Sequence, residues 1–451
     1  MRHAPTRRVG AFFLKMSWQK LFPLTARVND AEHLEIGGCD VTALAQEFDT
    51  PLYVYDETTL RTQATDALNA LRAHWEDATL LYATKAYFAP FLARLYREWG
   101  LGLDVTSEAE MWLAQNAGFD PALIYVHGNN KTRQEIRAAL AMGVTHFVID
   151  NLDEIARIAE SARQWNRTPR LLIRLSPNID AHTHRYMTTG VADSKFGLGI
   201  QNGMAERAAR EIARYDNLDL VGLHFHIGSQ VFDTDALREA LNAVLDVAQA
   251  WRTKFDFALR ELNIGGGWGV AYNDAQTTLD VPAFIAQTTA ALRAGLRARG
   301  LNETLKLIAE PGRGLIARAG VALYRVGSVK DIPGVRSYVA VDGGMGDNVR
   351  PALYAAQYQA YLANRFGENA SREYAIAGRY CEQGDVLIER AALPETRVGD
   401  LVAIPVAGAY QIPMASNYNL IPRPAVVLAQ NGRARLVRRR ETLEDMLACE
   451  I

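Results

Sequence analysis

The middle of the chain repeats one pattern, in which a short apolar run is followed by a stretch whose apolar residues have helical spacing. Nearly continuous apolar runs such as 171–175 and 307–309 are typical of strands buried on both faces of a parallel sheet. Helices are predicted between the runs, for example over 107–116 and 132–141. The predicted strands are 79–85, 101–105, 122–127, 145–150, 170–175, 219–226, 259–264 and 305–310. We therefore expect an α/β fold, a (β/α)₈ TIM barrel, with a doubly wound open sheet as the alternative.

The pattern changes after about residue 320, where short strands alternate with Gly and Pro turns. This predicts a C-terminal, mainly β domain, and we expect the N-terminal segment, with a strand near 33–36 and a helix near 41–48, to complete it. The predicted strands of this domain include 337–341, 385–389, 400–404 and 425–428. The expected division is a disordered leader at 1–27, an N-terminal segment at 28–56, a barrel at 57–315 and a β domain at 316–451.

The composition excludes several classes of protein. A net charge of −2 gives no electrostatic reason to expect nucleic acid or an anionic membrane as a partner. The three cysteines are scattered without metal spacing, which suits a reducing compartment. The basic first twenty residues contain an apolar core of only residues 10–14, too short to span a membrane. We therefore expect a cytoplasmic protein.

Polar or glycine residues stand at the C-terminal end of each predicted barrel strand, where barrel active sites are built. They are Lys85, Asp104, His127, Asp150, Arg174, His226, Gly265–Gly267 and Glu310. Lys85 ends an apolar run without an earlier charge. A partly desolvated lysine is a nucleophile toward carbonyls, as a covalent bond to pyridoxal phosphate requires. A plain surface lysine is the alternative that this segment alone favours.

The last two strand ends suggest a phosphate site and an electron sink. Gly265, Gly266 and Gly267 let backbone N–H groups approach an anion closely, although a flexible turn is an equal alternative. In barrels the phosphate site usually follows strands seven and eight. Glu310 is placed to hold a pyridine nitrogen protonated, which favours decarboxylation. The alternative for Glu310 is a salt bridge with Arg313.

Two histidines in His224-Phe-His226 allow competing hypotheses. We expect only one of them to enter the barrel mouth, His226 to stack on a cofactor ring, and Ser229 to donate to a phosphate. Each histidine could instead be a satisfied core residue. A His-x-His pair also begins the site of some metal-dependent hydrolases. The later strands offer glycines and Glu310 in place of further metal ligands, so no metal is expected. Cys381, among polar turn residues beside Glu382, predicts an exposed, working thiol.

A series of motifs runs along the chain. They are Tyr82-Ala-Thr-Lys-Ala86, His182-Thr-His184 with Thr189-Gly190 and Lys195-Phe-Gly197, His226-Ile-Gly-Ser-Gln230, Gly265-Gly-Gly267, Glu310-Pro-Gly-Arg313, Asp347-Asn-Val-Arg-Pro-Ala-Leu-Tyr354, Cys381-Glu-Gln-Gly-Asp385, and Gly408-Ala-Tyr410 with Ser416-Asn-Tyr-Asn419. From about Val28 to the C-terminus the chain resembles the diaminopimelate decarboxylases, pyridoxal phosphate-dependent enzymes with the alanine-racemase fold. The resemblance implies decarboxylation of meso-diaminopimelate to L-lysine and CO₂, the last step of lysine biosynthesis.

The resemblance also implies roles for residues. Lys85 would bond to the cofactor, His226 would stack on it and Glu310 would pair with its pyridinium. Cys381 and Glu382 would enter the other subunit's site in a homodimer, with Cys381 protonating the α-carbon. The other expected cofactor-binding residues are Asp104, Ser229, Gly265, Gly266, Gly267, Gly312, Arg313 and Tyr410, and the expected substrate-binding residues are Arg313, Arg350, Tyr354, Glu382 and Tyr410.

The zwitterionic far end of diaminopimelate fits arginines and an acid, whereas paired arginines would repel the bare ammonium of ornithine. The chain departs from the family at Gln383, after Tyr410 at residues 411–413, and at 106–110. These departures concern substrate fit more than cofactor chemistry. Three alternatives therefore stay open: a decarboxylase of ornithine, arginine or a carboxylated polyamine, an inactive homologue that binds partners, and the metal-dependent hydrolase.

Overall fold

The structure is a computed structural model that describes residues 18–179 and 194–451. Two compact units are considered separately. The barrel unit comprises the described residues of Gln63–Gly269 and Leu279–Leu315. The β unit comprises the described residues up to Thr62, together with Val270–Thr278 and Ile316–Ile451. The motif residues His182-Thr-His184 and Thr189-Gly190 lie outside the described residues.

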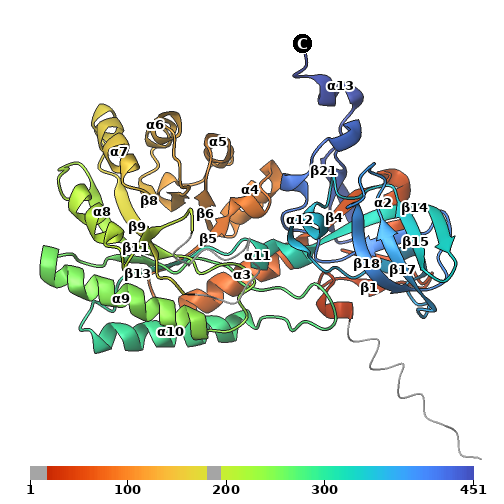
Figure 1. The fold of residues 1–451 in the computed structure, drawn as a ribbon, viewed down its shortest axis with the longest axis horizontal. Coiled ribbons are helices and arrows are strands. Elements are labelled where there is room, and N and C mark those ends of the chain that lie inside the picture. Colours follow the sequence, from red (N-terminus) through yellow and green to blue (C-terminus); the bar gives the residue numbers. More distant parts are fainter. Residues whose placement is uncertain (1–17, 180–193) are drawn as a thin grey trace, which may run out of the picture. The chain divides into compact units, whose positions relative to one another are not determined.

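Eight parallel strands form the closed ring of the barrel unit (Figure 1). In chain order they are β5 (Ala78–Ala83), β6 (Gly102–Val105), β7 (Ile124–Val126), β8 (His146–Ile149), β9 (Arg170–Ser176), β11 (Asp219–Phe225), β12 (Glu261–Asn263) and β13 (Lys306–Ala309). The ring closes because β13 pairs with β5 and β8 pairs with β9, and the short β10 (Leu198–Gly199) extends β9. The predicted barrel is confirmed, and the open-sheet alternative is wrong.

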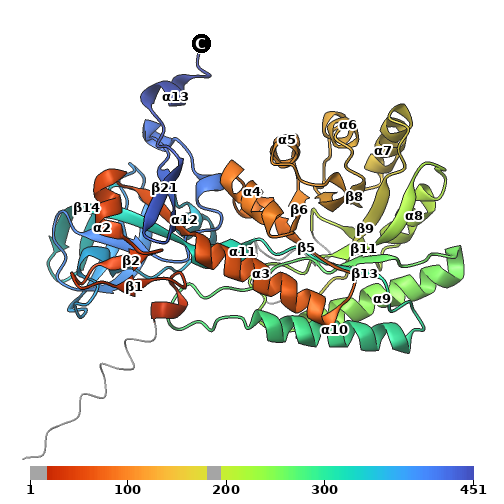
Figure 2. The same cartoon turned by 180° about the vertical axis from the view of Figure 1, so that it is seen from behind.

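Helices follow the strands on the outside of the barrel, as Figures 1 and 2 show from two sides. The predicted helices at 107–116 and 132–141 are confirmed. Ser107 caps α5 by accepting from the Glu110 N–H, and Thr132 forms a capping box with Glu135 at α6. The helices are α3 (Glu57–His74), which leads into the barrel, α4 (Pro90–Glu98), α5 (Glu108–Asn116), α6 (Arg133–Ala141), α7 (Asp153–Gln164), α8 (Met204–Ile212), α9 (Asp235–Phe255), α10 (Val281–Ala298) and α11 (Arg313–Ile316).

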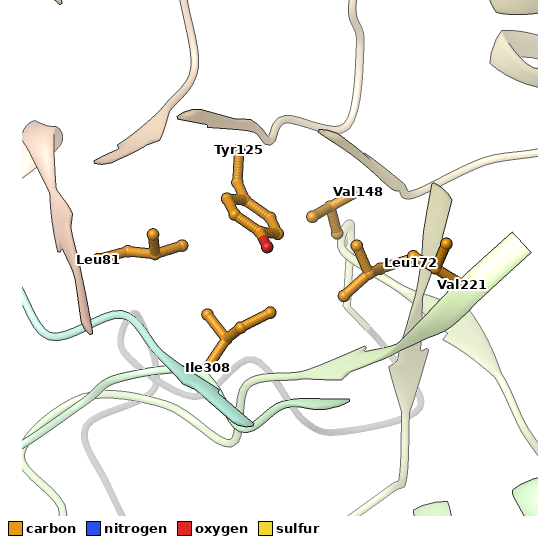
Figure 3. Packing of buried hydrophobic residues seen from close by; sticks show 6 residues of the cluster. All are labelled: Leu81, Tyr125, Val148, Leu172, Val221 and Ile308. Carbon is orange, nitrogen blue, oxygen red and sulfur yellow. The ribbon is translucent and has the colours of Figure 1, made fainter. Parts of the chain in front are cut away.

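Apolar side chains fill the interior of the barrel. They come from β5, β7, β8, β9, β11 and β13, and each is at most 1% exposed. Figure 3 shows these side chains close to one another between the strands. The cluster consists of Leu81, Tyr125, Val148, Leu172, Val221 and Ile308. A filled interior leaves no channel, so polar chemistry is confined to the ends of the strands.

The β unit contains a nine-stranded sheet to which the segment before the barrel contributes a strand. This strand, β4 (Leu52–Asp56), pairs with β14 (Gly320–Ile332) on one side and with β20 (Ala425–Gln430) on the other. The N-terminal segment therefore completes the β domain, as predicted. The other strands are β15 (Arg336–Val341), β16 (Tyr361–Leu362), β17 (Arg372–Ala377), β18 (Val386–Leu393), β19 (Leu401–Ile404) and β21 (Arg433–Arg438).

The first described residues also belong to the β unit. Leu21 and Phe22 are fully buried, and the Phe22 ring lies 5.2 Å from the Tyr361 ring and 5.5 Å from that of Phe366. The expectation of a disordered leader is therefore wrong for residues 18–27, because their apolar side chains pack into this unit. The segment continues through the three-stranded sheet of β1 (Arg27–Val28), β2 (Leu34–Ile36) and β3 (Cys39–Asp40) to α2 (Val41–Glu47).

None of the helices in residues 18–179 and 194–451 has the length and apolarity that a membrane-crossing segment needs.

Candidate active site

Lys85 lies in a single 3-10 turn, Thr84–Ala86, that follows β5. The Thr84 hydroxyl donates to the backbone carbonyl of Asp104 at 2.8 Å, which fixes the turn on β6. The turn carries the Lys85 side chain past the end of the strand, where it is exposed. Lys85 is therefore not desolvated in the chain by itself, and this prediction is wrong. Its amine is nevertheless close enough to favour the charged form of the Asp104 carboxyl.

Glu310 directly follows β13 and is 7% exposed. Its Oε1 lies 3.0 Å from His224 Nε2, and its Oε2 accepts a hydrogen bond from Asn263 Nδ2 at 2.9 Å. The Nε2 atom of His127 lies 3.3 Å from the same Oε2. Burial opposes ionisation, but the two histidines and the hydrogen bond from His224 hold the pKa of Glu310 well below its usual range. Glu310 is therefore a buried anion.

Asp104, near the end of β6, has a raised pKa and therefore tends to be protonated. Burial and then the negative charge of Glu310 raise the pKa of Asp104 to about 8, although Lys85 opposes the shift. Between the two carboxyls lies His127, whose Nε2 is 3.7 Å from Asp104 Oδ1. Burial lowers the pKa of His127 well below its usual value, so this imidazole is neutral. The site thus holds one anionic and one protonated carboxyl near neutral pH.

Both histidines of the His224-Phe-His226 segment face this site. His224 has no exposed surface and contacts Glu310, while His226 lies next to Gly266, whose N–H points at its Nδ1 at 3.3 Å. Burial, followed by the positive charges of Lys85 and Arg174, lowers the pKa of His226 to about 3. The expectation that only one histidine enters the barrel mouth is wrong, because residues two apart on a strand share a face.

The glycine triplet after β12 forms a backbone cradle. A Cβ atom on Gly265, Gly266 or Gly267 would lie within 2.6 Å of a backbone oxygen of a neighbouring segment, so only glycine fits. Gly265 and Gly267 also have positive φ angles of 72° and 87°. Close by, Arg313 Nη2 donates to the Ser229 hydroxyl at 3.1 Å. The Gly265 and Gly266 N–H groups are engaged by Asn263 and His226, and beside the triplet the barrel unit places a hydroxyl and a guanidinium where an anion can be received.

The segment before β10 is connected to the ends of β8 and β9. The Gly197 N–H donates to Asp150 Oδ1 at 2.7 Å, and the Arg174 guanidinium lies 4.6 Å from the Phe196 ring centre. Behind Asp150, Glu154 Oε1 accepts from its N–H. The predicted strand-end residues Asp150 and Arg174 thus position the Lys195-Phe-Gly197 motif.

These residues fit pyridoxal phosphate, which needs an accessible amine, an acid at the ring nitrogen and a phosphate cradle. Lys85, Glu310 and the glycine triplet could supply these three groups. His127, His224 and Glu310 also place potential ligand atoms within 4.8 Å of one another, as a metal site would require. The Oε atoms of Glu310 are, however, already engaged by Asn263 and His224. Asn263 is not among the predicted site residues, although a polar residue that closes an apolar run before three glycines is a usable signal.

The β unit carries the predicted substrate residues Arg350, Tyr354 and Tyr410. Arg350, at the start of α12 (Arg350–Tyr354), is 3% exposed and donates to Tyr272 Oη at 2.6 Å and to Tyr358 Oη at 2.9 Å. Its guanidinium carbon lies 5.8 Å and 5.9 Å from the Tyr354 and Tyr410 ring centres. Burial acts to lower the pKa of Arg350, but the two phenols raise it overall. Within the described parts of the chain, this buried cation has no carboxylate partner in an ion pair.

Cys381 and Glu382 lie in the turn between β17 and β18, and both are exposed. The predicted exposure of the thiol is confirmed. The Cys381 N–H donates to Asn419 Oδ1 at 2.9 Å, and Asp385 Oδ1 accepts from the Met345 N–H at 2.6 Å. The turn is therefore held on both sides, by the Ser416–Asn419 motif and by the loop that precedes Arg350.

The raised pKa of Asp104 gives a pH-dependent stability. Its folded-state pKa of about 8 exceeds the unfolded value of about 3.9, so stability from the protonated form is lost as pH rises toward 8. Relative to wild type, the cofactor-free Asp104→Asn variant should gain about 4 kcal/mol between about pH 5 and pH 8, measured by urea unfolding. The exposed Asp77→Asn change is the control and should give no such gain. Parallel pH profiles for wild type and Asp104→Asn would contradict this assignment.

Known proteins match this chain closely. The family model of the pyridoxal-dependent decarboxylases, pyridoxal binding domain, matches residues 58–317. A diaminopimelate decarboxylase from Bacillus subtilis is 43% identical over 427 residues, 95% of this chain and 97% of the relative. Another, from Staphylococcus aureus, is 40% identical and covers 94% of this chain and 99% of the relative.

Solved structures of decarboxylases are also similar to this chain. The structure of diaminopimelate decarboxylase from M. jannaschii in complex with L-lysine has a TM-score of 0.86 and 31% identity, and covers 95% of this chain and 98% of that one. A lysine/ornithine decarboxylase from Vibrio vulnificus with putrescine has a TM-score of 0.72 and 26% identity, with coverages of 87% and 97%. The family resemblance, the decarboxylase activity and the cofactor expected from the sequence are confirmed. The chain therefore belongs to the pyridoxal-dependent decarboxylases and, among them, to the diaminopimelate decarboxylases.

Proposed function

We propose that this protein converts meso-diaminopimelate to L-lysine and CO₂ with pyridoxal phosphate held at the C-terminal ends of the barrel strands. The observation that carries the proposal is the buried anion of Glu310, fixed by His224 and Asn263. When bound, pyridoxal phosphate supplies an electron sink for the charge left on the α-carbon as CO₂ departs. An anionic carboxylate at the ring nitrogen keeps that nitrogen protonated and makes the sink strong.

The remaining cofactor roles follow from the site's chemistry. The exposed amine of Lys85 would bond to the cofactor aldehyde, and the neutral ring of His226 would stack on the cofactor. Asp104 would complete the polar wall beside Glu310. The phosphate would be received by N–H, hydroxyl and guanidinium groups, since these donors suit an anion. The residues proposed for this are Ser229, Gly265, Gly266, Gly267, Gly312, Arg313 and Tyr410.

The substrate assignment rests on Arg350. A buried cation whose partners are two neutral phenols is costly unless an anion completes the site. The distal carboxylate of diaminopimelate would be that anion, and Arg313 and Glu382 would meet its other charged groups, with Tyr354 and Tyr410 beside them. Ornithine lacks this carboxylate and would place an ammonium near Arg350, which would repel it.

We further propose a homodimer in which Cys381 and Glu382 act in the partner's site. The support is their exposure and the fixed backbone of their turn. An exposed thiol is free to approach a reacting carbon, and Cys381 would protonate the α-carbon after CO₂ leaves.

Turnover and chemical labelling test the function. Borohydride reduction of the holoenzyme should fix the pyridoxyl group on the peptide that contains Lys85. Wild type should decarboxylate diaminopimelate and leave ornithine essentially unchanged, and Lys85→Ala should lose about a thousandfold or more in kcat. Lys254→Ala, an exposed lysine on α9, is the matched control. Labelling of another lysine, or faster turnover of ornithine than of diaminopimelate, would refute the proposal.

Subunit complementation tests the shared site. Mixing Lys85→Ala with Cys381→Ala should restore about a quarter of wild-type activity, because half of the dimers are then hybrids with one intact site of two. Lys85→Ala mixed with Glu310→Gln should restore none, since both changes damage the barrel's own site. Native mass spectrometry confirms subunit exchange. Equal recovery in the two mixtures, or none in the first despite exchange, would exclude a site shared in this way.

A further inference from the structure

Asn263 stands between the two ends of the proposed cofactor site. It is the last residue of β12, two residues before Gly265, and has no exposed surface. Its side chain uses both polar atoms: Nδ2 donates to Glu310 Oε2 at 2.9 Å, and Oδ1 accepts from the Gly265 N–H at 2.9 Å. One amide therefore contacts both the carboxylate at the ring end and the first glycine at the phosphate end.

These contacts form a closed ring of hydrogen bonds. The Glu310 N–H donates to the Gly265 carbonyl at 2.9 Å, which completes the circuit between Asn263, Gly265 and Glu310. The orientation of the amide is fixed by its partners, because the reversed amide would place oxygen against the carboxylate and NH₂ against an N–H. Asparagine is thus matched at both ends, whereas aspartate could serve only the Gly265 end.

The backbone packing makes the ring stiff. A Cβ on Gly266 would lie 2.3 Å from the Glu310 carbonyl oxygen, so the triplet already touches the strand end that carries the carboxylate. His224 holds the other carboxylate oxygen at 3.0 Å. A shift of the glycine backbone would therefore displace the Glu310 carboxylate, because the Asn263 side chain is hydrogen-bonded to both.

We propose that Asn263 is a positioning residue that sets the spacing between the pyridine-nitrogen and phosphate ends of the cofactor site. The inference rests on the proposed roles of Glu310 and the glycine triplet. It assigns Asn263 a function in ligand affinity at both ends. A buried amide that merely stabilises the barrel would affect unfolding and leave ligand affinity unchanged.

Binding to the cofactor-free protein tests the proposal with three probes: inorganic phosphate for one end, pyridoxal for the other and pyridoxal phosphate for both. Asn263→Ala should weaken phosphate and pyridoxal by about tenfold each, and pyridoxal phosphate by more, as expected when hydrogen bonds to both ends are lost. Asn263→Asp retains the acceptor for Gly265 and loses the donor to Glu310. It should bind phosphate within about threefold of wild type and pyridoxal about tenfold more weakly.

The control is Asn217→Ala, whose amide donates to the Ala159 carbonyl at 2.9 Å before the start of β11, at the other end of the barrel. It should lower the melting temperature and leave all three affinities unchanged. The proposal is overturned if Asn263→Ala changes only the melting temperature, or if Asn263→Asp loses phosphate and pyridoxal equally. Should Asn263→Ala fail to fold, the difference between the phosphate and pyridoxal affinities of Asn263→Asp decides alone. A wild-type protein that binds none of the probes would overturn the proposed function as well.

Discussion

The chemistry of this protein depends on one buried carboxylate being kept ionised. A carboxylate away from water ordinarily gains a proton, as Asp104 does a short distance away. Glu310 stays ionised because His224 and the Asn263 amide engage its two oxygens and His127 Nε2 lies 3.3 Å from one of them. The two carboxyls then divide into an acid and a base, an arrangement typical of sites that move protons.

The fold was predictable from the sequence because its main signal is local. Apolar runs such as 171–175 and 307–309 became β9 and β13, and capping at Ser107 and Thr132 fixed the starts of α5 and α6. Ring closure was inferred from strand number and the serial placement of polar strand ends. The order of segment 18–27 could not be predicted locally, since the burial of Phe22 depends on Tyr361 and Phe366, more than three hundred residues away.

The site was predictable in its residue types and less so in its contacts. Motifs identified Lys85, Glu310 and the glycine triplet, since each follows an apolar strand directly. The exposure of Lys85 could not be predicted, because it depends on a 3-10 turn of three residues. The contacts of Asn263 could not be predicted either, because they depend on the pairing of β12 with β13, which brings Glu310 beside a residue 47 positions earlier in the chain.

The protonation state of the cofactor's ring nitrogen tests the central claim most directly. Pyridoxal phosphate labelled at that nitrogen would be bound to the wild type and to Glu310→Gln, and the nitrogen chemical shift would be measured by NMR at neutral pH. A protonated nitrogen in the wild type and an unprotonated one in Glu310→Gln is the expected result. An unprotonated nitrogen in the wild type, or the same shift in both proteins, would contradict the role of Glu310.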